Sequence, residues 1–163
     1  MTARQELALP AGGSTIRKKA NSQAKKEPMK QAVSTRTGTF KQSVRIRDFQ
    51  LTTDEPTAVG GSDEGPGALE LLAASLASCT AVTMEMYASH KGWDIGDVEV
   101  EAQFSPADRG CPTRFGLVLR FPDDLTDEQV QRLKVIAAKC PVHRVLEGEV
   151  MFDERVERTQ LAS

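Results

Sequence analysis

The sequence predicts an α+β fold in which an antiparallel sheet packs on a long buried central helix, with a second helix beside it. Strand-like stretches cluster before and after each helical stretch instead of alternating with them one for one. No charged residue occurs between Glu70 and Glu85, and a helix that is apolar all round is normally a buried one. A sheet this small would cover such a helix poorly in one subunit, so we expect an intertwined homodimer.

Length and composition indicate one domain. The chain has 163 residues, of which 39% are hydrophobic, enough for a single core. We expect residues 31–158 to form this domain and residues 1–30 to form a flexible basic arm. The arm lacks apolar periodicity and holds six basic residues against one acidic residue between positions 17 and 30.

Charge, aromatic content and cysteine usage narrow the class of protein. The formal net charge is −2, and one Trp and one Tyr offer little for stacking on bases, so we expect no nucleic-acid partner. Three cysteines are too few for a secreted disulfide framework. The N-terminus has no signal-like apolar segment, and no apolar run reaches the roughly 18 to 20 residues of a membrane span. We therefore expect a cytoplasmic protein with no membrane contact.

The first half of the domain predicts short strands and then the long helix. Residues 32–53 alternate weakly between apolar and polar side chains, with Gly38 as a turn, which indicates two or three short antiparallel strands. Residues 53–67 are rich in turn-forming residues. From Ala68 to about Lys91 the pattern becomes helical, and Gly92 supplies a stop.

The second half predicts a hairpin, a broken helix and a last strand. Ile95–Phe104 and Thr113–Arg120 alternate as the strands of one antiparallel hairpin. A capping box at Thr126 begins a helix whose apolar face runs to Cys140, and Pro141 bends the chain there. A short helical segment then ends at Gly148, and residues 149–156 are expected to form a final strand.

Two cysteines carry the chemical hypothesis. A buried cysteine is ordinarily an inert small hydrophobe. Cys79 on a nearly all-apolar helix and Cys140 at a helix break together favour thiol redox chemistry, and backbone N–H groups at the start of the segment after Cys140 favour a thiolate. Cys111, in the hairpin turn, is expected to be a bystander. Cys140-x-x-His143 is half of a zinc site, but no second close-spaced ligand pair accompanies it, so no metal is expected.

Several motifs together resemble the OsmC/organic hydroperoxide resistance family of thiol peroxidases. They are Gly60-Gly61, Gly65-Pro66, the stretch from Leu69 to Cys79-Thr80, and Lys139-Cys140-Pro141-Val142-His143-Arg144-Val145-Leu146. The resemblance runs from about Ala32 to Val156. It implies an intertwined homodimer with the site at the subunit interface, Cys79 as the peroxidatic residue and Cys140 as the resolving residue.

The chemistry also follows from general thiol reactivity. A thiolate attacks the O–O bond of a hydroperoxide and becomes a sulfenic acid, which condenses with a second thiol to a disulfide. Burial alone raises a thiol pKa, so a positive group should lie near Cys79. The resemblance implies an arginine from an early strand; Arg36, Arg45 and Arg47 are the candidates, with Arg36 first and Arg45 second. The family also places a glutamate ten residues before the peroxidatic cysteine; this chain has Leu69 there and Glu70 next to it. Glu70 either reaches the arginine from a shifted angle or serves the helix N-terminus.

The sequence thus predicts a thiol-dependent peroxidase that reduces organic hydroperoxides without metal, flavin or other cofactor. Apolar residues around Cys79, including Leu76, Met84 and Met86, would favour apolar peroxides. The resemblance implies a dithiol reductant of a small or lipoyl type. Two alternatives stay open: a non-catalytic dimer of the same fold that binds a small apolar ligand, and a thiol redox sensor.

Overall fold

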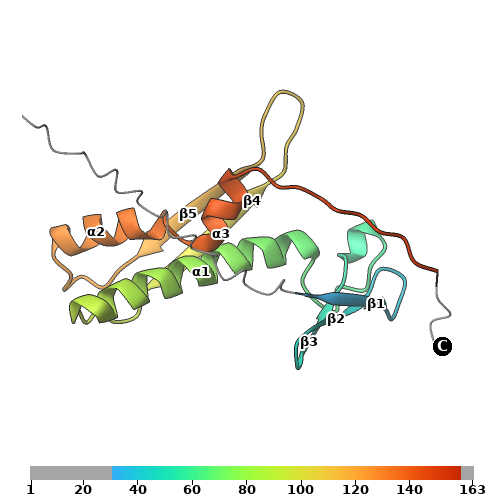
Figure 1. Ribbon diagram of the computed structural model, residues 1–163, viewed down its shortest axis with the longest axis horizontal. Helices are drawn as coiled ribbons and strands as arrows, with labels where there is room; N and C mark the ends of the chain where they lie inside the picture. Colours follow the sequence, from blue (N-terminus) through green and yellow to red (C-terminus); the bar gives the residue numbers. More distant parts are fainter. Residues whose placement is uncertain (1–30, 159–163) are drawn as a thin grey trace, which may run out of the picture. The chain divides into compact units, whose positions relative to one another are not determined.

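The computed structural model describes residues 31–158. The basic arm predicted for residues 1–30 lies outside the described residues. The elements, in chain order, are β1 Val33–Arg36, β2 Gln42–Ile46, β3 Phe49–Thr53, a short 3-10 helix Thr57–Val59, α1 Ala68–Lys91, β4 Glu99–Ser105, β5 Arg114–Arg120, α2 Asp127–Ala137 and α3 Pro141–Glu147 (Figure 1). This mixture of antiparallel strands and helices confirms the predicted α+β class.

The strands form two separate sheets. β1, β2 and β3 make an antiparallel meander in which Val44 pairs with Leu51 and Ile46 with Phe49, and β4 and β5 make an antiparallel hairpin. Both sets of strands were predicted, although β4 begins at Glu99 and not at Ile95. The turn between β2 and β3 places Arg47 at φ 55°, a left-handed conformation that is uncommon for a residue with a Cβ.

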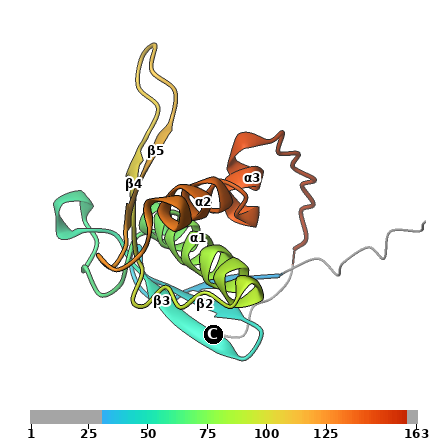
Figure 2. The ribbon, with the colours of Figure 1, turned by 90° about the vertical axis from the view of Figure 1, so that its left-hand side faces the viewer.

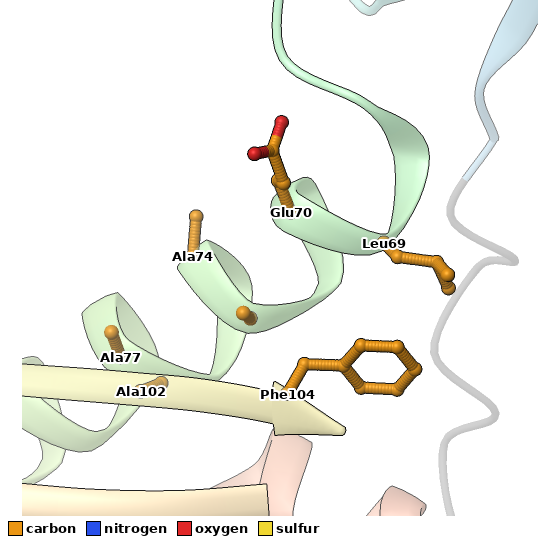
Figure 3. Close-up of a pocket in the computed structure, with 7 residues that line it drawn as sticks. Leu69, Glu70, Ala74, Ala77, Ala102 and Phe104 are labelled. Atoms are coloured by element: carbon orange, nitrogen blue, oxygen red, sulfur yellow. The ribbon is translucent and has the colours of Figure 1, made fainter. Parts of the chain in front are cut away.

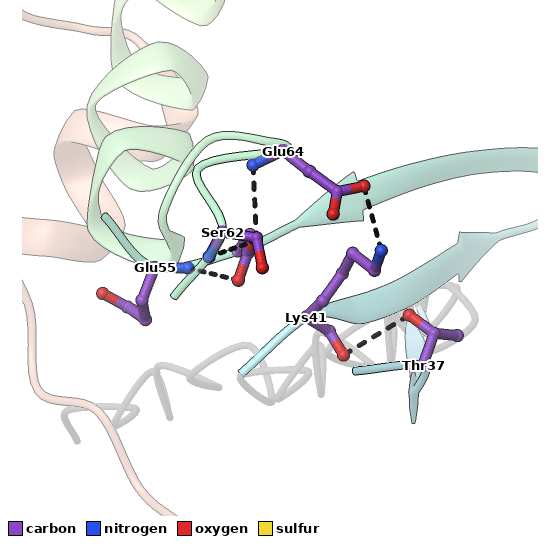
Figure 4. Close-up of polar contacts among 6 residues, drawn as sticks. Thr37, Lys41, Glu55, Ser62 and Glu64 are labelled. Carbon is purple, nitrogen blue, oxygen red and sulfur yellow. Dashed lines mark hydrogen bonds and ion pairs between the residues drawn. The ribbon is translucent and has the colours of Figure 1, made fainter. Parts of the chain in front are cut away.

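The loop between β3 and α1 is built around one buried carboxylate. Asp54 Oδ1 accepts from the N–H of Glu55 at 2.9 Å, and Oδ2 accepts from the N–H groups of Ser62 at 3.0 Å and Glu64 at 3.3 Å (Figure 4). Lys41 Nζ binds Glu64 at 2.9 Å beside it. Burial raises the pKa of Asp54, but the three N–H groups and Lys41 outweigh it and lower the pKa below its ordinary value.

Helix α1 has the predicted bounds but is less buried than its composition suggested. Its buried residues are Leu76, Thr80, Met84 and Ala88, which recur every fourth position on one face. The opposite face leaves Val82 and Met86 exposed within this chain. Gly92 closes the helix at φ 66°, where residues with a Cβ are strained.

The core forms where α1 meets the hairpin and α2. It is built by Met84, Ala88, Ile95, Leu133, Ile136 and Ala137, with partly buried residues such as Tyr87 and Trp93 packed against it. Figures 1 and 2 show α1 lying along β4 and β5, with α2 and α3 beside it. By length and composition α1 is apolar enough to cross a membrane, which the sequence analysis did not anticipate. Its packing against β4, α2 and α3 makes it the core helix of the fold.

The chain bends at Cys140, as predicted. Thr126 caps α2 through a capping box, with Gln129 N–H donating to Thr126 Oγ1 at 3.2 Å. α2 ends at Ala137, and Cys140 is the N-cap residue of α3, whose first residue is Pro141. Pro141 fits there because the first helical residue needs no N–H partner.

The final strand expected at residues 149–156 does not form in this chain. Residues 149–158 contain no helix or strand and leave Met151, Phe152 and Val156 more than 80% exposed. A strand needs a neighbour to satisfy its N–H and C=O groups, and none of the described strands pairs with this segment. The side chains of this segment alternate as in a strand, but none of the described strands of this chain pairs with it.

Candidate functional site

The two cysteines of the predicted pair lie together. Cys79 lies in the middle of α1 and Cys140 at the junction of α2 and α3, and each thiol is among the groups that shift the pKa of the other. Both are free thiols. Cys140 is completely buried, whereas Cys79 is partly exposed. The fold therefore joins one accessible thiol with one protected thiol.

Cys140 is the more acidic member of the pair. Burial raises the pKa of the Cys140 thiol, but the Cys79 thiol, the backbone N–H of His143, the Thr80 hydroxyl and the backbone N–H of Val142 lower it, and the net shift is downward. The N-cap position of Cys140 brings these N–H groups to its sulfur, as the Cys-Pro break indicated.

Cys79 shifts the opposite way. Burial and its contact with Cys140 raise the pKa of the Cys79 thiol, and the backbone N–H of Val142 and the side chain of Thr83 offset this only in part. The pKa values of the two thiols therefore shift in opposite directions, because each thiol interacts with the other.

The candidate arginines lie elsewhere in this chain. Arg36 on β1 is exposed and donates from Nε to the carbonyl of Gly38 at 2.8 Å, and Arg45 on β2 is exposed. Arg47 lies over the ring of Phe49, at 5.0 Å from its centroid. The groups that shift the Cys79 pKa most do not include an arginine. The role predicted for Arg36 or Arg45 thus stays a prediction.

Glu70 serves the helix N-terminus. Its Oε2 accepts the backbone N–H of Gly67 at 2.7 Å, which satisfies one of the unpaired donors that precede α1. Leu69, at the position of the family glutamate, lines a shallow cavity of about 410 Å³ together with Phe104, Ala102 and alanines of α1 (Figure 3). Glu70 also lines this cavity, so its wall combines apolar side chains with one carboxylate.

A second cavity of about 230 Å³ lies between α1, β5 and α3. Four of its lining side chains are apolar and three are polar. The lining residues are Leu76, Thr113, Phe115, Leu117, His143, Leu146 and Glu147. His143 Nε2 pairs with Glu147 Oε1 at 3.0 Å. Leu76 precedes Cys79 by three residues and His143 follows Cys140 by three residues, so the cavity shares the elements that carry the cysteines, although neither cysteine lines it.

The other predicted residues divide between core and surface. Leu76 and Met84 are 2% or less exposed, and Met84 belongs to the core cluster, whereas Met86 is exposed. Cys111 is exposed in the hairpin loop, where its backbone pairs with that of Asp108 in a single antiparallel β-bridge. Within residues 31–158, Cys140 and His143 join no group of three or more metal-ligating side chains.

Sequence reasoning missed Thr80. This residue is completely buried, and its hydroxyl lies beside Cys140. The available signal was its spacing: Thr80 lies four residues after Leu76 and four before Met84, on the buried face of α1. Among the described residues the Thr80 hydroxyl has no hydrogen-bond partner that meets ordinary geometry.

Comparison with known proteins places this architecture in one family. The family model for OsmC-like protein matches residues 61–155, which include both cysteine motifs. A search of curated proteins found no match.

Solved structures share the fold at low sequence identity. A protein from Psychrobacter arcticus assigned to the osmotic stress and detoxification response is 25% identical, aligns over 73% of this chain and 89% of that one, and gives a TM-score of 0.63. An organic hydroperoxide resistance protein OsmC from Legionella pneumophila is 20% identical, aligns over 75% of this chain and 91% of that one, and gives a TM-score of 0.58. OhrB of Bacillus subtilis, an organic hydroperoxide resistance protein, is 22% identical, aligns over 74% of this chain and 91% of that one, and gives a TM-score of 0.54. Because the family model covers more than half of the chain and includes both cysteines, this protein is a member of the OsmC-like family.

Proposed function

We propose that this protein is a thiol-dependent peroxidase that reduces organic hydroperoxides in the cytoplasm. The observation that carries the proposal is the contact between Cys79 and Cys140, two free thiols brought together from distant parts of the chain. The accessible sulfur can meet a substrate, and the buried sulfur can resolve the product without meeting the peroxide itself.

The reaction can be written on these two residues alone. Cys79 passes its proton to Cys140, and the Cys79 thiolate attacks the O–O bond of the hydroperoxide. This forms a Cys79 sulfenic acid, and the departing alkoxide takes the proton back from Cys140 and leaves as an alcohol. The Cys140 thiolate then attacks the Cys79 sulfur, which forms the disulfide and releases hydroxide. The thiol pair loses two electrons and the peroxide gains them; a dithiol reductant, of lipoyl or similar type, restores the pair.

The homodimer is part of this proposal. Within one chain no arginine is among the main causes of the Cys79 pKa shift, while Arg36 and Arg45 lie exposed on the first sheet. In an intertwined homodimer Arg36 or Arg45 of a second copy can reach Cys79. A guanidinium there would favour the proton position in which Cys79 is the thiolate.

The test is an intact-mass and thiol measurement on the reduced protein. A stoichiometric amount of cumene hydroperoxide should remove two thiols quickly as a Cys79–Cys140 disulfide. Cys140→Ser should instead accumulate a sulfenic acid on Cys79, and Cys79→Ser should react slowly or not at all. Cys111→Ser is the matched control, because Cys111 is exposed in a loop away from the pair, and it should behave like the natural protein.

The apolar-ligand dimer is the second candidate, and the apolar cavity beside the pair favours it. Thiols that stay intact at a large excess of peroxide would contradict the peroxidase and leave the binding function in front. Binding of a long-chain alcohol in the cavity lined by Leu76, with both thiols reduced throughout, would then support it.

A further inference from the structure

The cavity of about 230 Å³ between α1, β5 and α3 combines an apolar lining with a pair of polar side chains from one helix. Its polar pair is His143 and Glu147, which lie four residues apart on α3 and therefore on one face of it. Pockets for drug-sized ligands have roughly 300 to 1,000 Å³, so this cavity suits a smaller molecule. Its apolar lining comes from Leu76, Phe115, Leu117 and Leu146.

The contact between the two polar side chains decides where the proton of the imidazole lies. His143 Nε2 is 3.0 Å from Glu147 Oε1. A carboxylate only accepts hydrogen bonds, so Nε2 carries a proton in this pair. A proton on Nδ1 as well would bury an N–H group without an acceptor, which is costly. His143 therefore offers a lone pair at Nδ1, held in this tautomer by Glu147.

This lone pair has no partner in the fold. His143 Nδ1 is buried, and no hydrogen-bond partner for it exists among the described residues. The His143 side chain as a whole is 26% exposed, so the ring turns Nδ1 inward and its other atoms toward the surface. Buried polar atoms without partners are few in folded proteins, and each is expected to have a physical reason. The missing partner here must be a donor.

We propose that this cavity binds a small apolar molecule with one hydroxyl or hydroperoxyl group, and that His143 Nδ1 accepts the hydrogen bond from this O–H. The four apolar side chains hold the carbon skeleton, and Glu147 keeps Nδ1 an acceptor. A carboxylate ligand does not fit, because it has no donor and would lie near the charge of Glu147. Neither cysteine lines the cavity, so the site goes beyond the proposed peroxidase and does not rest on it.

The first test compares ligands that do not oxidise thiols, by NMR titration of the reduced, full-length protein. 1-Octanol carries the donor, 1-methoxyheptane is its isomer without a donor, and octanoate carries a negative charge. 1-Octanol should bind about fivefold more tightly than 1-methoxyheptane, the factor for one neutral hydrogen bond, and octanoate should bind most weakly. His143→Phe should remove the difference between the two isomers. His90→Phe is the matched control, because His90 is exposed on α1, and it should retain the difference.

The second test reads the hydrogen bond directly from the ¹⁵N shifts of the imidazole rings. The chain has two histidines, His90 and His143, so each ring can be assigned. 1-Octanol should move the His143 Nδ1 signal to the position of a hydrogen-bonded acceptor and leave the signals of His90 in place. This shift is measured on the natural protein, so it decides the matter even if His143→Phe does not fold.

Two results would overturn the proposal. One is equal affinity for 1-octanol and 1-methoxyheptane. The other is an Nδ1 signal that is already that of a hydrogen-bonded acceptor without ligand, because water, the Thr80 hydroxyl or a second copy of the chain would then supply the donor. A preference for 1-octanol in a protein whose thiols survive excess peroxide upholds this site and rejects the peroxidase. Rapid thiol oxidation without that preference does the reverse.

Discussion

Neighbouring residues at the start of α1 have separate tasks. Leu69 occupies the position where the resemblance implies a glutamate, and it lines a shallow cavity together with Glu70 and Phe104. Glu70 accepts the N–H of Gly67 and lies in the first turn, where a carboxylate also interacts favourably with the helix dipole. The offset of one residue turns the carboxylate by about 100° around the helix, and within this chain the carboxylate accepts a backbone N–H.

This assignment predicts a loss of stability without a loss of thiol chemistry. Glu70→Ala should lower the free energy of unfolding by about 1 kcal/mol, since it removes a cap and a favourable charge. Glu85→Ala is the matched control, because Glu85 is exposed on the same helix without a capping role, and its effect should be smaller. Urea unfolding gives the stability, and thiol loss with cumene hydroperoxide gives the reactivity. A large fall in the rate of thiol loss with an unchanged free energy of unfolding would contradict the capping role and indicate that Glu70 acts in the catalytic site.

At the level of elements, the loop before α1 depends on Asp54. Three backbone N–H groups converge on this buried carboxylate, and Gly61 packs so closely against Glu55 that a Cβ would lie 1.8 Å from its carbonyl oxygen. Gly65 approaches Thr52 in the same way, at 2.5 Å. The glycines thus allow close approach of backbone, and the carboxylate satisfies the N–H groups that this approach turns inward.

Asp54 should make stability depend on acidic pH. Its pKa is lowered in the folded state, so its contribution is present above the ordinary value of 3.8 and is lost as the pH falls through the lower folded pKa. Asp54→Asn should be less stable than the natural protein at neutral pH, because an amide oxygen is a weaker acceptor than a carboxylate. The difference should vanish in acid, as measured by urea unfolding at several pH values.

Asp63→Asn is the control for this pH effect. Asp63 is exposed on the same loop at φ 56°, a conformation that Asn tolerates, so its substitution should leave the pH dependence unchanged. A stability difference for Asp54→Asn that persists below the folded pKa would show that the carboxylate charge is not the cause.

At the level of the whole molecule, apolar side chains remain uncovered in this chain. They lie on the first sheet, on the outer face of α1 and in residues 149–158, and they include Phe49, Leu69, Val82, Met86, Met151, Phe152 and Val156. Exposed apolar surface on this scale marks an interaction site. The proposed intertwined homodimer would cover it and would give residues 149–158 an edge on which to form the missing strand.

The dimer predicts a specific effect for Phe152, whose exposed fraction is 82% in this chain. Phe152→Asp should weaken self-association, because a charge replaces a large apolar side chain at a buried contact. Sedimentation velocity should find a dimer for the natural protein and a larger share of monomer for the variant. Arg155→Ala is the control, since Arg155 is also exposed in this segment and pairs with Glu157 at 2.7 Å. A natural protein that sediments as a monomer would contradict the dimer.

Local patterns determined most of the elements of this protein. The capping box at Thr126, the stop at Gly92 and the break at Pro141 act within a few residues, so the bounds of the helices follow from neighbouring residues alone. The Cys-Pro break also indicated the N–H groups that favour a thiolate at Cys140. The resemblance of the cysteine motifs pointed to the family, and the family model confirmed it.

Tertiary structure alone decided the opposite pKa shifts of the two thiols and which residues surround them. The pKa directions of Cys79 and Cys140 arise from the meeting of α1 with the α2–α3 junction, as does the placement of the Thr80 hydroxyl. Whether residues 149–156 form a strand likewise depends on tertiary structure. The alternation of their side chains identifies a strand-like segment, but it does not supply the neighbouring strand with which the segment must pair. The sequence determined the elements because their causes are local; the site and the uncovered apolar surface depend on contacts between residues far apart in the chain.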